Sequence, residues 1–265
     1  MAIVSPRAQA AALITGASSG IGRELARQLA VRGHDLILVA RRVELLEELG
    51  RELRAQHGRG VEVVACDVSE PARRGQLAER VRATGLEVEV LALSAGFGMG
   101  GPLIDQDPDR LRLMMRTNVE STVALAREFT PAMAARRRGS VLIISSMAGN
   151  QPMPNLAVYS ATKAALTSFA EALHEELRVH GVSVTALCPG SVATDFAQIA
   201  EMSDTERRLP KAMIATAAAT AAAGLSALDR NRRVSVPGWG PRALTFTGGH
   251  APRALWLRAC RKLMA

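Results

Sequence analysis

The sequence predicts an α/β fold in which helices flank a doubly wound parallel sheet of about seven strands. Three observations support this prediction. Short apolar runs alternate with longer amphipathic stretches along most of the chain. The apolar runs are nearly continuous in Val, Ile and Leu, which is typical of strands buried on both faces of a parallel sheet. A glycine-rich turn joins the first run to the first amphipathic stretch.

The predicted elements alternate in chain order. We expect strands at residues 11–15, 36–40, 61–66, 88–93, 140–145, 182–187 and 234–236. We expect helices at residues 21–32, 43–57, 71–84, 110–137 and 155–180. An uncharged, alanine-rich stretch at residues 212–228 is too short and too weakly apolar to span a membrane, so a packed helix is expected there.

Length and composition indicate a single globular domain over residues 1–265. The chain is 48% apolar and 22% charged, and it contains no internal repeat or low-complexity linker. Cys66, Cys188 and Cys260 show no pair at metal-ligand or redox spacing, which favours a reducing, cytoplasmic location and no metal site. The first nine residues, interrupted by Pro6 and Arg7, fit neither a secretory signal nor a membrane span.

The chain is strongly basic, with a net charge of +8 and a pI near 10.5, which raises the question of nucleic-acid binding. The arginines are scattered, however, and aromatic residues make up only 3% of the chain. Single-stranded nucleic acids need more aromatic side chains than this for stacking. We therefore expect no nucleic-acid partner.

The glycine-rich turn predicts a dinucleotide site. Glycines allow a tight turn and a close approach of the backbone to a phosphate, and the following helix N-terminus attracts negative charge. This strand-turn-helix setting is that of a Rossmann domain. The residues assigned to the site are Gly16, Ser18, Ser19, Gly20, Ile21 and Gly22.

The end of the second predicted strand selects between cofactors. A carboxylate there would bind the adenosine ribose of NAD, whereas arginines would pair with the 2'-phosphate of NADP. Asp35 begins this strand and so lies far from the ligand end, while Arg41 and Arg42 lie at that end. The sequence therefore favours NADP(H) over NAD(H).

Asp67 and Val68 follow the third predicted strand. They are expected to meet the adenine edge of the cofactor. An Asp that only starts a turn is an equally good interpretation of this position.

Tyr159 and Lys163 form the pair to which the chemistry is assigned. A four-residue step on a helix places both side chains on one face. Tyr159 is the only tyrosine, and the chain contains 3 lysines against 30 arginines. Since a nearby cation favours the phenolate, Lys163 is expected to lower the pKa of Tyr159 and make it a general acid and base.

In this order, the motifs resemble those of the short-chain dehydrogenase/reductase family, in its single-domain branch of about 250 residues. The resemblance runs from Ala11 to about Gly240. The motifs that carry it are Thr15 to Gly22, Asp67, Ser94-Ala95-Gly96, Asn118, Ser145-Ser146, Tyr159-x-x-x-Lys163 and Pro189 to Thr194.

The resemblance implies a role for each of four residues. Tyr159 would be the catalytic acid and base, and Ser146 would polarise the substrate carbonyl. Lys163 would hold the nicotinamide ribose, and Asn118 would anchor a water that relays protons to Lys163. As an isolated residue, Asn118 would instead fill a helix irregularity.

The same resemblance extends the cofactor site. It adds Ser94, Ala95 and Gly96 after the fourth strand, where the family commonly has Asn in place of Ser94. A shorter side chain there could change the support of the central sheet. It also adds a segment along the nicotinamide, namely Pro189, Gly190, Val192 and Thr194.

The implied activity is NADPH-dependent interconversion of a hydrophobic ketone or aldehyde and its alcohol. An apolar substrate wall is expected from Phe97, Met99, Met147, Met153, Leu156 and residues 196–202, within a lid at residues 191–212. A non-catalytic NADP-binding sensor is the main alternative. An epimerase or dehydratase of the longer branch of the family is a second one.

The tail at residues 252–265 has Trp256, Cys260 and Leu263 at helical spacing, with basic residues nearby. A basic amphipathic helix of this kind can contact a membrane surface, or it can pack on its own domain or on a partner subunit. The resemblance also implies a homodimer or homotetramer formed through the long helices that contain Asn118 and Tyr159.

Overall fold

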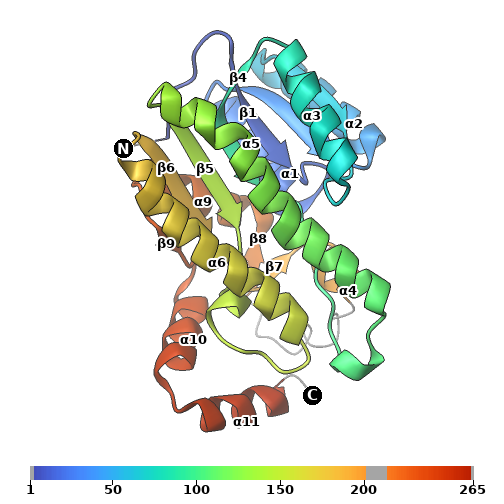
Figure 1. Ribbon diagram of the computed structural model, residues 1–265, viewed down its shortest axis with the longest axis vertical. Helices are drawn as coiled ribbons and strands as arrows, with labels where there is room; N and C mark the ends of the chain where they lie inside the picture. Colours follow the sequence, from blue (N-terminus) through green and yellow to red (C-terminus); the bar gives the residue numbers. More distant parts are fainter. Residues whose placement is uncertain (1–2, 201–213, 264–265) are drawn as a thin grey trace.

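The computed structural model describes residues 3–200 and 214–263, and the described chain is built around a parallel sheet (Figure 1). The sheet has seven strands in the order β3-β2-β1-β4-β5-β6-β9, which confirms the predicted doubly wound topology. The strands are β1 (Ala10–Thr15), β2 (Asp35–Ala40), β3 (Val61–Ala65), β4 (Glu87–Leu93), β5 (Gly139–Ile144), β6 (Val182–Leu187) and β9 (Val234–Ser235).

Helices connect these strands and cover both faces of the sheet. They are α1 (Gly20–Val31), α2 (Val43–His57), α3 (Pro71–Ala83), α4 (Pro108–Met115), α5 (Ser121–Ala135), α6 (Ala157–Arg178), α7 (Phe196–Ile199), α9 (Ala217–Asp229), α10 (Trp239–His250) and α11 (Arg253–Leu263). Short 3₁₀ turns occur at η1 (Leu103–Asp105) and η3 (Met147–Asn150).

The core is split into two layers by the sheet. Leu13 packs with α3, α5 and α6 on one face, and its neighbour Ile14 packs with α1, α2 and α9 on the other. Both side chains are fully buried. Because alternate residues of a strand point to opposite faces, a strand buried on both sides must be apolar at every position. This explains the continuous apolar runs of the sequence.

The long helix expected at residues 110–137 is interrupted. It begins at Pro108, because the Asp107 carboxylate caps the first turn by accepting the N–H groups of Asp109 and Arg110. It then passes through the π-helical turn η2 (Arg116–Glu120) before α5 begins. A π turn contains one extra residue, so α4 and α5 do not share a single helical repeat.

The segment after β6 also departs from expectation. A two-stranded parallel ribbon of β7 (Val192–Ala193) and β8 (Ala215–Thr216) closes the base of the predicted lid. The alanine-rich helix α9 begins at Ala217, because the Thr216 hydroxyl accepts the N–H of Ala219. Residues 201–213, which include most of the predicted lid, lie outside the described residues.

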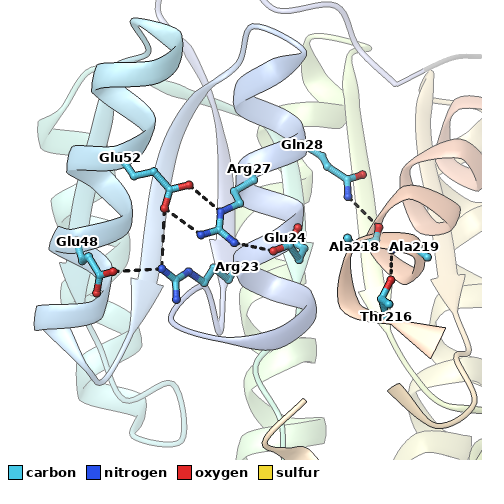
Figure 2. A network of polar contacts seen from close by, with 9 residues as sticks. All are labelled: Arg23, Glu24, Arg27, Gln28, Glu48, Glu52, Thr216, Ala218 and Ala219. Carbon is cyan, nitrogen blue, oxygen red and sulfur yellow. Dashed lines mark hydrogen bonds and ion pairs between the residues drawn. The ribbon is translucent and has the colours of Figure 1, made fainter. Parts of the chain in front are cut away.

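Helix α1 is fixed on both sides by polar contacts (Figure 2). The Arg27 guanidinium donates to both carboxylate oxygens of Glu52 on α2, at 2.8 and 2.9 Å. The Gln28 amide donates to the Ala218 carbonyl at the start of α9, at 2.9 Å. These contacts set the position of the helix whose N-terminus carries the glycine-rich turn.

Candidate active site

A cavity of about 630 Å³ lies where β1, β2, β4, β5 and β6 end. This is the usual place for a ligand in a doubly wound sheet. Each residue that the sequence assigned to the cofactor lines it: Gly16, Ser18, Ser19, Gly20, Ile21, Gly22, Arg41, Arg42, Asp67, Val68, Ser94, Ala95, Gly96, Tyr159, Lys163, Pro189, Gly190, Val192 and Thr194.

The glycine-rich turn requires glycine for steric reasons. Gly16 has a φ of +69°, and a Cβ there would lie 3.0 Å from the backbone of Ala95. A Cβ on Gly22 would lie 2.3 Å from the Gly16 carbonyl oxygen. Ser19, the N-cap of α1, makes no side-chain hydrogen bond to the helix. The turn therefore leaves the first amides of α1 without a side-chain cap, which suits them to a phosphate group.

Arg42 closes the other side of this turn. Its Nη2 donates to the Ser19 hydroxyl at 2.9 Å and to the Ser18 hydroxyl at 3.1 Å. Arg41 is 70% exposed, and its Nη1 lies 3.9 Å from Asp67 Oδ2. Two guanidiniums and two hydroxyls thus surround one corner of the cavity, and this donor set fits a phosphate monoester.

The two Asp residues weighed in the sequence occupy different places. Asp67 lines the cavity, and its Oδ1 accepts the N–H and the hydroxyl of Ser69, as in a turn-starting Asp. Asp35 begins β2, where its Oδ1 accepts the Gly60 N–H at 2.8 Å. It is absent from the cavity lining, as expected from its position at the amino end of the strand.

Thr15 is a supporting residue to which the sequence analysis assigned no separate role. Its Oγ1 accepts the N–H groups of Ser94 at 3.0 Å and of Ala95 at 3.1 Å. These bonds join the ends of β1 and β4 through the backbone of Ser94, so they do not require the longer Asn side chain. The sequence signal for this supporting role is the hydroxyl-bearing residue at the end of the first strand.

Tyr159, Lys163 and Ser146 meet in the middle of the cavity. The first two are buried on α6, with Lys163 Nζ 5.8 Å from the centre of the tyrosine ring. Ser146 precedes η3, where its Oγ accepts the Ala148 N–H at 3.1 Å. A side-chain hydrogen bond between Ser146 and Tyr159 lowers the pKa of the phenol. One acid and one polarising hydroxyl therefore face the same space.

The expected lowering of the Tyr159 pKa by Lys163 is wrong for this structure. Burial raises the pKa of Tyr159 to about 12, more than the Ser146 hydrogen bond lowers it. Burial also lowers the pKa of Lys163 to about 8. The ammonium donates to the Ile144 carbonyl at 2.9 Å and lies 5.8 Å from the centre of the Tyr159 ring. Tyr159 is consequently a proton donor at neutral pH.

Asn118 lies behind the cavity and does not line it. It is fully buried in η2, where its Oδ1 accepts the Phe97 N–H at 3.0 Å. Its Nδ2 donates to the Phe97 carbonyl at 2.9 Å and to Thr162 Oγ1 at 3.1 Å. Asn118 therefore fills a helix irregularity, the second of the two interpretations, and connects it to α6. The water relay to Lys163 stays a prediction.

Adjacent serines have different surroundings. Ser145 is turned into the packing between β5 and α6, where its hydroxyl contacts the Lys163 carbonyl at 2.8 Å and Thr167 Oγ1 at 2.7 Å. Ser146 instead acts on the phenol, because its side chain lowers the pKa of Tyr159. This arrangement supports the choice of Ser146 as the substrate-polarising residue.

The far end of the cavity is mainly apolar. Phe97, Met147, Met153, Leu156 and Phe196 line it as expected, and the Phe196 and Tyr159 rings lie 5.6 Å apart. Met99 is buried but does not reach the cavity, and Met202 lies outside the described residues. Ile199, within the expected residues 196–202, also lines the cavity, and the lining residues that the sequence analysis missed include Arg110, Leu113, Thr117, Pro241 and Leu244.

Pro241 and Leu244 belong to α10, a helix that the sequence analysis did not predict. The local sequence pattern gives no sign that these two residues line the cavity, because α10 reaches it only through its tertiary packing against η3. Among residues 3–200 and 214–263, no three His, Cys, Asp or Glu side chains are placed to hold a metal ion.

Comparisons with known proteins identify relatives of this arrangement. The family model for short chain dehydrogenase matches residues 10–204. "Dehydrogenase/reductase SDR family member 7B" of Bos taurus is 37% identical over 201 residues, covering 74% of this chain and 62% of that protein. "Very-long-chain 3-oxoacyl-CoA reductase" of Anas platyrhynchos is 36% identical over 208 residues, covering 76% of this chain and 66% of that protein.

Solved structures of dehydrogenases are also similar to this chain in fold and sequence. A short-chain dehydrogenase from Sphingobium yanoikuyae in complex with NADPH is 30% identical, with a TM-score of 0.81 over 90% of this chain and 92% of that one. A bulky-bulky ketone specific alcohol dehydrogenase from Comamonas testosteroni is 27% identical, with a TM-score of 0.76 and the same coverage. The glycine turn, the Tyr-x-x-x-Lys helix and the family match lead to one conclusion: the chain belongs to the short-chain dehydrogenase family.

Proposed function

We propose that the protein is an NADP-dependent oxidoreductase that interconverts a hydrophobic ketone or aldehyde and its alcohol. One observation supports this most directly. Tyr159, Ser146 and Lys163 lie between the phosphate-suited corner of the cavity and its apolar end. A substrate held at the apolar end would place its oxygen beside the only tyrosine of the chain.

In this proposal, each side chain has a distinct task. A bound nicotinamide cofactor would supply or accept the hydride. Tyr159 donates a proton to the substrate oxygen during reduction and takes it back during oxidation. Ser146 donates a hydrogen bond to that oxygen as negative charge develops on it. Lys163, held by Ile144, keeps a positive charge near the ring of the proton donor.

The preference for NADP rests on the Arg42 corner. Arg42 is held at both serine hydroxyls of the glycine turn, and Arg41 is exposed beside it. A 2'-phosphate would complete this donor set, whereas a 2'-hydroxyl would leave the Arg42 guanidinium with only the two serine hydroxyls as partners. The NADPH complex of the Sphingobium yanoikuyae relative supports the same assignment.

The proposed substrate class is a long-chain 3-oxoacyl thioester or a similarly apolar ketone. Phe97, Met147 and Leu156 provide an apolar wall, and sites of this kind bind ligands mainly through buried hydrocarbon. The name of the Anas platyrhynchos relative points to an acyl ketone. The chain spans 62% and 66% of the length of the two curated relatives described above.

The test is NADPH oxidation by the purified chain against a panel of 3-oxoacyl thioesters, steroid ketones, aromatic ketones and aldehydes. We expect turnover that the Tyr159→Phe variant reduces by about 10²–10⁴-fold, while NADPH binding measured by fluorescence is unchanged. Equal turnover in the variant would refute the role of Tyr159. NADPH binding without turnover of any panel member would favour the sensor alternative.

A further inference from the structure

Helices α10 and α11 expose arginines together with aromatic and aliphatic side chains, and we name this set of exposed residues the tail surface. Figure 1 shows these two helices beyond the carboxyl ends of the strands, at the end of the molecule where the cavity lies. Trp239 is 78% exposed, Phe246 66% and Leu255 60%. The tail surface consists of Trp239, Arg242, Phe246, Arg253, Leu255, Leu257, Arg258 and Arg261.

The inner side of the same helices is packed on the domain. Trp256 is buried, and its Nε1 donates to the Pro152 carbonyl at 3.3 Å. Cys260, one turn further on, is also buried. Pro241 and Leu244 on α10 line the cavity. The tail therefore covers its own domain with one side, as one of the sequence interpretations held, and still presents aromatic and aliphatic groups on the other.

The charge of this region has one sign. Residues 230–265 contain seven arginines and one lysine, with no Asp or Glu. In the described chain, neither Arg258 nor Arg261 forms an ion pair with a carboxylate, and Arg242 and Arg253 donate only to backbone carbonyls. The arginines of α1 differ, because Arg23 and Arg27 are paired with glutamates (Figure 2).

We propose that the tail surface binds anionic lipid bilayers and holds the cavity beside the membrane. Exposed arginines with interspersed Trp, Phe and Leu side chains complement a negatively charged headgroup layer over hydrocarbon. A second copy of the chain is a poorer partner, since a symmetric contact would place arginines opposite arginines. Nucleic acid would match the charge but would not bury Trp239, Phe246 and Leu255 together.

Binding would be peripheral. Within residues 3–200 and 214–263, no helix has both the length and the apolar character to cross a bilayer. Since α10 contacts the cavity with Pro241 and the solvent with Trp239, a lipid leaving the bilayer would have a short path to the site. This consequence for substrate delivery rests on the proposed function, whereas membrane binding itself does not.

The experiment is flotation of the full chain with phosphatidylcholine vesicles, with and without phosphatidylglycerol, at low and high salt. We expect flotation only with the anionic vesicles and its loss in high salt. Arg258→Gln/Arg261→Gln should weaken vesicle binding roughly 30-fold, since each arginine near an anionic surface contributes about fivefold. Arg258→Lys/Arg261→Lys should retain most of the binding because it keeps the charge.

The matched control is Arg51→Gln/Arg127→Gln, which removes the same charge from exposed positions on α2 and α5. It should float like the wild type.

Trp239→Ser/Phe246→Ser should also lose flotation, while NADPH binding shows that the variant is folded. Equal flotation on neutral vesicles, equal loss in the control, or no flotation of the wild type would overturn the proposal. Dimerisation that Arg258→Gln/Arg261→Gln abolishes, seen by light scattering, would also overturn it. Because flotation needs no turnover, its failure would leave the proposed reaction untouched.

Discussion

The two ends of the cavity are built in different ways. The cofactor end consists of one strand-turn-helix and the ends of neighbouring strands, so backbone and short side chains determine its shape. The apolar end is assembled from η3, α4, α7 and α10, which are separated in the sequence. A site built by backbone conformation leaves a motif in the sequence, whereas a site built by packed side chains leaves only hydrophobicity. The predictions below test this contrast and the chemistry between the two ends.

The largest effect is expected where the two ends meet. Ser146→Ala should lower kcat by about 10²–10³-fold, because it removes a hydrogen bond that stabilises developing charge. Ser145→Ala is the matched control. It removes hydrogen bonds to Lys163 and Thr167, so it should lower the melting temperature and change kcat little. Equal losses of kcat in the two variants would contradict the assignment of Ser146.

The cofactor end should respond to the loss of one guanidinium. Arg42→Ala should raise KM for NADPH by about 10–100-fold and leave KM for NADH nearly unchanged, because a charge-assisted hydrogen bond contributes about 1.5–3 kcal/mol. Arg51→Ala, on the exposed side of α2, should change neither constant. A parallel rise in both KM values would show that Arg42 supports the fold of the turn rather than binding the 2'-phosphate.

The pH dependence should report Lys163. Its pKa is lowered to about 8 by burial, so its charge is present below this pH and lost above it. The pKa of Tyr159 is raised to about 12, so the proton donor stays protonated over the same range. We expect kcat/KM for reduction to fall up to tenfold for each pH unit above about 8. A profile that stays flat well into the alkaline range would show that the ammonium charge is not required.

The smallest effect is expected at the apolar end. Leu244→Ser should lower kcat/KM for a long-chain ketone by about 3–10-fold, since the apolar contact of one half-buried side chain contributes about 0.7–1.4 kcal/mol. KM for NADPH should not change. Val31→Ser is a control at an exposed position outside the cavity and should change neither kcat/KM for the ketone nor KM for NADPH. A loss confined to NADPH binding would mean that α10 borders the cofactor rather than the substrate.

Much of the fold could be predicted because its determinants are local. The parallel strands are buried on both faces, so their apolar runs are uninterrupted, and the strand boundaries were close to those observed. A helix irregularity at Asn118 was one interpretation of the sequence, but its π form could not be predicted, because it depends on the contacts that Asn118 makes with Phe97 and Thr162. Helix α10 also escaped prediction, because its glycines and threonines do not form a clear helical pattern.

The site also divides into features that local sequence determines and features that tertiary packing determines. The positions of the cofactor-lining residues followed from strand ends and a motif. The electrostatics did not, because the sequence shows that Lys163 is one turn from Tyr159 but not that both are removed from water. Burial determines the protonation of this pair more strongly than their mutual spacing does.

The π turn between α4 and α5 has a consequence for insertions and deletions in this part of the chain. Deleting one residue within Arg116–Glu120 would restore a continuous α-helix with little rotation of α4 relative to α5, because a π turn fits its extra residue into about one helical turn. Arg110 and Leu113 would still face the cavity, and the change would fall on the contacts that Asn118 makes with Phe97 and Thr162. The extra residue of this short segment therefore serves the contacts of Asn118, and the side chains that α4 presents to a ligand do not depend on it.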